Sequence, residues 1–88
     1  PVRTISHWIG GKPTPGTSTR TSPVWNPATG AQQAEVLLAG TADVDAAVQA
    51  ARAAFETWGQ SSLSQRVKVL FAFRELVNAR MDDLAEII

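Results

Sequence analysis

The chain offers few side chains that could carry out chemistry. It contains one histidine, His7, and no cysteine. Within these residues, that composition excludes a histidine or cysteine metal cluster, a disulfide and a thiolate nucleophile. His7 stands between Ser6 and Trp8 in a stretch that alternates apolar and polar residues, so we interpret it as an ordinary histidine at a surface or strand edge. Serines and threonines have no base within reach that would activate them as nucleophiles.

Two groups of carboxylates resemble acid–base or metal sites. Asp43 and Asp45 are two residues apart, so on a helix they do not share a face, and capping or favourable interaction with the helix dipole explains them better. We interpret Asp82, Asp83 and Glu86 as a solvated face rather than as a cation site. Neither group predicts a catalytic pair.

The glycines and aromatic residues also have simple structural explanations. The pair at residues 10–11 is not a phosphate loop, because it lacks the Gly-x-Gly-x-x-Gly order and no helix begins after it. Phe55, Trp58 and Phe73 fall on apolar helical stripes, so we expect them to pack in a core rather than to form a stacking platform. From the residues alone, the chain is a small unit of strands and helices without an active site.

Composition and charge argue against several classes of protein. The 88 residues contain 8 basic and 8 acidic side chains, and scattered charges with a net charge of zero argue against nucleic acid or a membrane surface as a partner. No apolar run approaches the roughly 20 residues of a membrane span, and residues 1–4 do not resemble a signal peptide. We therefore expect a soluble, cytoplasmic protein with room for one small domain.

Residues 1–41 are predicted to form a β-hairpin and extended segments. They contain all five prolines and five of the six glycines. Residues 5–9 alternate as a half-buried strand does, and the two glycines that follow suit a hairpin turn. The returning strand is residues 12–14, where Pro13 favours an edge position. The remaining predictions are extended segments at 19–25 and 33–38, with a turn at 26–30 between them.

Residues 42–88 are predicted to form a helical hairpin, because the apolar period changes from 2 to 3.6. Thr41 is the expected N-cap of the first helix, and Gly59 is its expected stop. One apolar stripe extends over four turns of this helix. Its members are Val44, Ala47, Val48, Ala51, Ala54, Phe55 and Trp58.

The second helix should begin at Ser62, which forms a capping-box pattern with Gln65. It is apolar around most of its circumference up to Val77, which is typical of a helix buried on several sides. The polar stretch at 78–83 predicts a short break. The sequence then ends at residues 87–88 within the apolar pattern, so we expect an interrupted helix, in a fragment or in a chain that needs a partner.

Four stretches, in order and at suitable spacing, resemble the N-terminal part of aldehyde dehydrogenases. The turn at 26–30 is similar to the family's Asn-Pro-x-Thr-Gly turn. The other matches are the hairpin at 8–12, the first helix at 43–58 and the start of the second helix at Arg66 and Leu70. The resemblance covers about residues 7–88.

Within that superfamily, the chain looks most like the CoA-acylating methylmalonate-semialdehyde dehydrogenases. The stretches that carry this likeness are residues 7–11, 23–27 and 65–71. The alternatives are a succinate-semialdehyde or other NAD(P)-dependent semialdehyde dehydrogenase, a stand-alone helical-hairpin interaction module, and a small structural or oligomerisation protein.

The resemblance implies a much longer parent with an α/β fold, a Rossmann-like cofactor domain, a catalytic domain and a small β oligomerisation arm. A cysteine thiolate would attack the aldehyde, hydride would pass to NAD, and coenzyme A or water would resolve the thioester. In this family the catalytic and cofactor-binding residues lie downstream, so none is assigned here. The one site candidate is the backbone carbonyl of Trp25, just before the Asn-Pro turn, as a ligand of a monovalent cation.

The resemblance also implies partners. The 42–88 hairpin would pack on the cofactor-binding domain in the remainder of the dehydrogenase chain, and the parent would be a homo-oligomer, either a dimer or a tetramer. The 88 residues alone are expected to be inactive.

Overall fold

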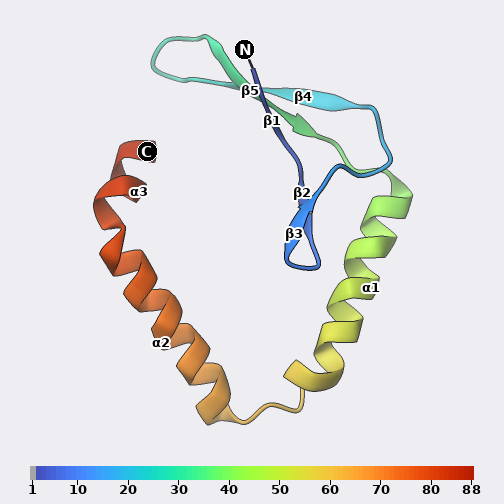
Figure 1. Ribbon diagram of the computed structural model, residues 1–88. Coiled ribbons are helices and arrows are strands. Elements are labelled where there is room, and N and C mark those ends of the chain that lie inside the picture. Colours follow the sequence, from blue (N-terminus) through green and yellow to red (C-terminus); the bar gives the residue numbers. More distant parts are fainter. Residues whose placement is uncertain (1) are drawn as a thin grey trace. The chain divides into compact units, whose positions relative to one another are not determined.

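The computed structural model describes residues 2–88, in which the strands precede the helices along the chain (Figure 1). The chain divides into two compact units, Pro1–Phe55 and Glu56–Ile88. The boundary falls inside the first helix, so most of that helix belongs to the unit that contains the strands.

The first β-rich segment contains two strands instead of one. β1 (Arg3–Ile5) and β2 (His7–Ile9) are separated at Ser6, so the prediction of a single strand at 5–9 is wrong in this detail. The division arises because the two strands have different partners: β1 joins a three-stranded sheet, whereas β2 pairs with β3 (Lys12–Thr14).

The β2–β3 hairpin confirms the predicted glycine turn. Gly10 and Gly11 have φ values of 64° and 79°, the positive values that a two-residue turn of this kind requires. Pro13 lies opposite Trp8 in the antiparallel register. Because the ribbon has only two strands, Pro13 is on an edge, as predicted.

The three-stranded sheet has the order β1-β5-β4, where β4 is Thr21–Trp25 and β5 is Gln32–Leu37. β5 is central: it pairs in parallel with β1 and antiparallel with β4. Ala34, in the middle of β5, is 1% exposed and is the buried apolar residue among those described. The predicted segments at 19–25 and 33–38 are therefore confirmed, with ends shifted by one or two residues.

The turn that joins β4 to β5 forms as predicted, and its asparagine organises it. The Asn26 side-chain Oδ1 accepts a hydrogen bond from the backbone N–H of Ala28 at 2.9 Å. The Asn26 carbonyl accepts from Gly30 N–H at 2.8 Å, and Asn26 N–H donates to the Ala31 carbonyl at 2.8 Å. Gly30 has a φ of 76°, which explains why glycine closes the turn.

Helix α1 (Thr41–Trp58) ends immediately before Gly59, as predicted. The prediction of Thr41 as the N-cap is wrong by one residue. The Gly40 carbonyl accepts the bond from Val44 N–H at 3.2 Å, so Gly40 caps the helix and Thr41 is its first residue. At this end of the helix, the Asp43 carboxylate accepts a hydrogen bond from Gly40 N–H at 2.8 Å.

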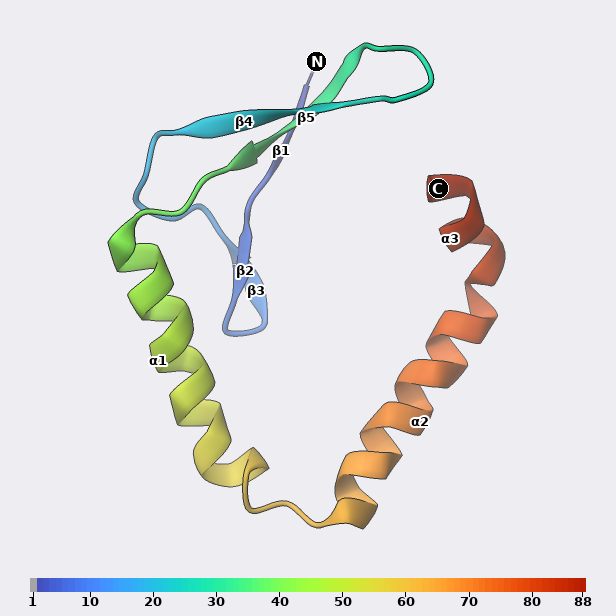
Figure 2. The same cartoon turned by 180° about the vertical axis from the view of Figure 1, so that it is seen from behind.

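Helix α2 (Leu63–Ala79) begins with the predicted capping box. Gln65 N–H donates to Ser62 Oγ at 3.2 Å, and Ser62 N–H donates to Gln65 Oε1 at 3.3 Å. The predicted break in 78–83 occurs at Arg80, where φ is −119° and ψ is 24°. Helix α3 (Met81–Ile87) follows; Figure 2 shows the same elements from behind.

The apolar side chains of the helices remain exposed. Phe55, Trp58 and Phe73 are 64%, 46% and 62% exposed, so the expectation that they form a core is wrong for the described residues. The physical reason is that a helix with apolar residues on several sides needs several neighbours, and in residues 2–88 each of these side chains stays about half or more exposed. None of the helices in this range combines the length and apolar composition that a bilayer crossing requires.

Candidate functional site

The described residues bring together no group of side chains that could hold a metal ion. Across residues 2–88, no three or more His, Asp or Glu side chains are placed to hold a metal ion. Asp82 and Asp83 lie in the exposed first turn of α3, where Asp83 pairs with Arg80 at 3.4 Å. Asp45 is exposed on α1, whereas Asp43 is 5% exposed.

Asp43 joins two separate backbone segments. Its Oδ1 accepts hydrogen bonds from Thr17 N–H at 2.9 Å and from Thr17 Oγ1 at 3.1 Å. Its Oδ2 accepts from Gly40 N–H at 2.8 Å. The carboxylate therefore fastens the loop after β3 to the first turn of α1. The predicted capping role of Asp43 is confirmed by its bond with Gly40, whereas its long-range contact with Thr17 was not predicted.

These hydrogen bonds favour the charged form of Asp43. Donation from Gly40 N–H is the largest influence, and it lowers the pKa of the carboxyl group below its ordinary value. Burial acts in the opposite direction. The two bonds from Thr17 and the nearby His7 lower the pKa further, so the net shift is downward.

His7 lies against the same loop. A Cβ built on Gly16 would be 2.8 Å from both Cδ2 and Nε2 of His7 and 3.1 Å from Asp43 Oδ2. Gly16 also has a φ of 76°, so both its conformation and its surroundings require glycine. Within residues 2–88, His7 Nε2 is a buried nitrogen without a hydrogen-bond partner. His7 is half-buried on a two-stranded ribbon, which agrees with the predicted edge position, whereas the burial of its Nε2 was not predicted.

No local sequence signal pointed clearly to this cluster, which we call the Asp43 cluster: His7, Gly16, Thr17, Gly40 and Asp43. Its members lie on β2, in the loop after β3, and at the start of α1. Only the tertiary structure brings such distant positions together. The available hint was the concentration of glycine and threonine at 16–17 and 40–41.

The candidate cation ligand, Trp25, lies at the end of β4. Its side chain is 57% exposed, and the pairing with β5 changes register between Val24 and Trp25. The next residue begins the Asn26 turn. The structure thus places the Trp25 backbone at an irregular strand end, and a single carbonyl there can supply only one ligand.

Arg66 connects α2 to the end of α1. Its guanidinium donates to the carbonyls of Trp58 and Gly59 at 3.2 and 3.1 Å and to Ser61 Oγ at 3.1 Å. Its charge also lies 6.0 Å from the centre of the Trp58 ring. Carbonyls at a helix C-terminus lack partners within the helix. Arg66 adds donors there beside Ser61, whose N–H and Oγ donate to the Trp58 carbonyl at 3.1 and 2.6 Å.

Each unit contains an apolar hollow among the described residues. The first, of about 380 Å³, lies between the β2–β3 turn and an alanine face of α1. The second, of about 310 Å³, runs along α2 and α3, and we call it the α2–α3 groove. It is lined by Phe73, Leu76, Val77, Arg80, Asp83, Leu84 and Ile87. Neither holds a group of polar side chains suited to catalysis.

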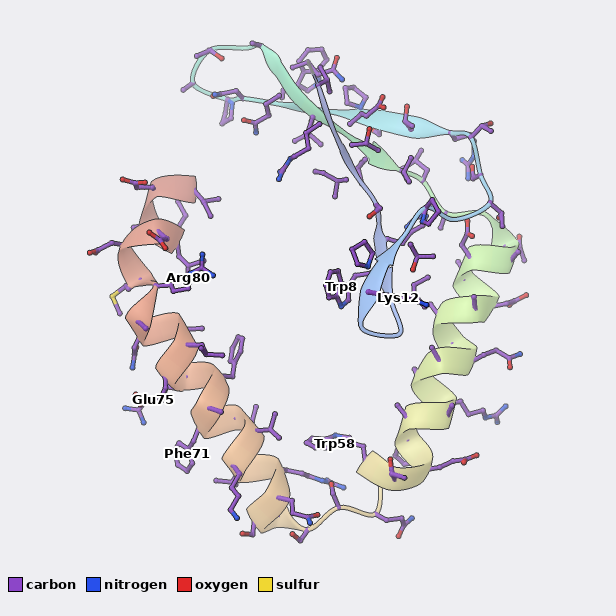
Figure 3. All side chains as sticks on the ribbon, in the orientation of Figure 1. Trp8, Lys12, Trp58, Phe71, Glu75 and Arg80 are labelled. Atoms are coloured by element: carbon purple, nitrogen blue, oxygen red, sulfur yellow. The ribbon has the colours of Figure 1, made fainter. Side chains whose placement is uncertain are left out.

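Figure 3 shows the directions of side chains on the β2–β3 hairpin and on α2. Trp8 and Lys12 project to opposite sides of the hairpin, and Trp8 is 71% exposed. Phe71 and Glu75 project from one side of α2, whereas Arg80 projects from the other. Phe71 is thus outside the α2–α3 groove.

Comparisons with known proteins all match the chain to aldehyde dehydrogenases. A sequence model of the aldehyde dehydrogenase family matches residues 14–88. Malonate-semialdehyde dehydrogenase of Bacillus pumilus (strain SAFR-032) is 39% identical over 87 residues, which cover 99% of this chain and 18% of that protein. Malonate-semialdehyde dehydrogenase 1 of Geobacillus kaustophilus (strain HTA426) is 39% identical over 84 residues, with coverages of 96% and 17%.

A solved structure agrees with these relatives. It is a crystal structure, complexed with NAD, of a protein from Sinorhizobium meliloti 1021 assigned as a methylmalonate-semialdehyde dehydrogenase. The TM-score is 0.92 and the identity is 42%, over 97% of this chain and 17% of that one. The chain therefore spans less than a fifth of the length of the relatives it matches.

Proposed function

Because the chain belongs to the aldehyde dehydrogenase family, we propose that it forms the N-terminal region of an NAD-dependent semialdehyde dehydrogenase. The observation that carries the proposal is the agreement in structure and sequence with the Sinorhizobium meliloti protein, at a TM-score of 0.92 and 42% identity. The malonate-semialdehyde dehydrogenases among the relatives support the same substrate class.

The proposed reaction is the oxidation of methylmalonate or malonate semialdehyde to an acyl-CoA. The aldehyde carbon loses hydride to NAD, which becomes NADH, and the acyl group passes to the sulfur of coenzyme A, whose thiol proton is released. The NAD in the Sinorhizobium meliloti structure supports this cofactor. Coenzyme A as the acceptor follows from the likeness to the CoA-acylating branch.

This chain would contribute structure rather than chemistry. It contains no cysteine, so the thiolate that attacks the aldehyde must come from elsewhere in the parent protein. None of its residues is proposed to bind NAD. Its role would be to add the strands and to place α1 and α2 against the remainder of the dehydrogenase chain.

The Trp25 carbonyl is proposed as one ligand of a monovalent cation. The register change beside it and the hydrogen-bonded Asn26 turn after it would fix the direction of the backbone at this point. The other oxygens would come from outside these residues. A thallium soak of parent crystals should give an anomalous peak at coordination distance from this oxygen, and no peak there would reject the site.

The parent is proposed to be a cytoplasmic homo-oligomer, either a dimer or a tetramer. The absence of cysteine from this chain is compatible with a reducing compartment. Sedimentation velocity on the full-length protein would give the oligomeric state directly.

The function can be tested by assaying the full-length protein with methylmalonate, malonate and succinate semialdehydes in the presence of NAD. We expect NADH formation to be fastest with one of the first two, and an acyl-CoA product when coenzyme A is present. A preference for succinate semialdehyde would reject the proposed substrate. A carboxylate product in the presence of coenzyme A would reject CoA acylation.

The exposed apolar helices favour one competing function, a helical-hairpin interaction module. The same assay separates the two, because a module would show no turnover with any of the aldehydes. The 88-residue chain alone should produce no NADH under either hypothesis.

A further inference from the structure

We draw no further inference here: the strongest candidate, the exposed apolar α2–α3 groove between Phe73 and Ile87, carries none because nothing in the structure shows what covers it.

Discussion

At the scale of single residues, Gly16 and Gly30 form a natural pair for measuring backbone and steric costs separately. Both have a φ of 76°, a conformation that costs an L-residue about 1–2 kcal/mol. They differ in their surroundings: a Cβ at Gly16 would meet His7 at 2.8 Å, whereas nothing lies within 4 Å of one at Gly30.

We therefore expect Gly16→Ala to destabilise the fold by about 2–4 kcal/mol, because it adds a steric clash to the conformational cost. Gly30→Ala should cost only about 1–2 kcal/mol. Urea unfolding followed by far-UV circular dichroism measures both. Equal losses in the two variants would show that the contact with His7 has no energetic effect.

Arg66 should stabilise the junction between α1 and α2 through its hydrogen bonds. Replacing it with alanine removes the donors to the Trp58 and Gly59 carbonyls and to Ser61. Since these are charge-assisted bonds at a partly exposed site, we expect a loss of about 1–2 kcal/mol.

Arg74→Ala is the matched control, because Arg74 is an exposed arginine of the same helix. It should change the free energy of unfolding by less than about 0.5 kcal/mol. Arg66→Lys should recover only part of the loss, since an ammonium group cannot reach three acceptors with the planar geometry of a guanidinium. Full recovery by lysine would contradict this account.

At the scale of elements, the start of α1 should be sensitive to acid through Asp43. Its pKa is lowered in the folded state, chiefly by Gly40 N–H, so its contribution to stability is complete above the ordinary aspartate pKa of about 3.9. That contribution is lost as the pH falls through the lower, folded-state value.

The change to test is Asp43→Asn, with the exposed Asp45→Asn as control. Helix content should fall as the pH drops below about 4 in the unaltered chain and in the control. The Asp43→Asn variant should have less helix near neutral pH and a flatter acid profile. An acid transition of the same size in that variant would show that other carboxyl groups cause it.

Which elements were predictable depends on the range of the interactions that form them. The Gly10-Gly11 hairpin, the Asn26 turn and the Ser62 capping box were predicted because residues within five positions determine them. The division of the first segment at Ser6 was not, because it depends on the parallel pairing of β1 with the distant β5.

The contacts of the candidate site could not be predicted from the sequence for the same reason, because they join distant segments. The roles of Asp43 and Arg66 lie in contacts with other segments, and neither the helical period nor the residue type reveals such contacts. The prediction of core positions on the helices failed for a related reason. An apolar stripe shows that a surface needs covering, but it does not show which segment covers it.

At the scale of the whole molecule, exposed apolar side chains should make the isolated chain associate with itself. The α2–α3 groove includes Phe73, which is 62% exposed, and Leu84, which is 45% exposed. Burying one such side chain is worth about 1.5–3 kcal/mol, so even a small contact between copies should be favourable.

Phe73→Glu should weaken this association roughly tenfold or more, as measured by analytical ultracentrifugation. Phe71→Glu is the control, because Phe71 is 57% exposed yet lies outside the groove. Its effect should be smaller. A monomeric chain at high concentration, or equal effects of the two substitutions, would reject the groove as the contact surface.

The parallel pairing of β1 with β5 also bears on the order in which this region acquires its structure during translation. β1 leaves the ribosome first, but its partner β5 is synthesised about 30 residues later, a delay of roughly 2–6 s at ordinary elongation rates. The β4–β5 hairpin is closed by its own short turn and can form as soon as it emerges. We therefore expect pulsed hydrogen exchange during refolding to protect β4 and β5 before β1, and earlier protection of β1 would contradict this order. Until β5 arrives, the nascent chain carries an unpaired strand, which is a natural binding site for a chaperone that recognises extended segments.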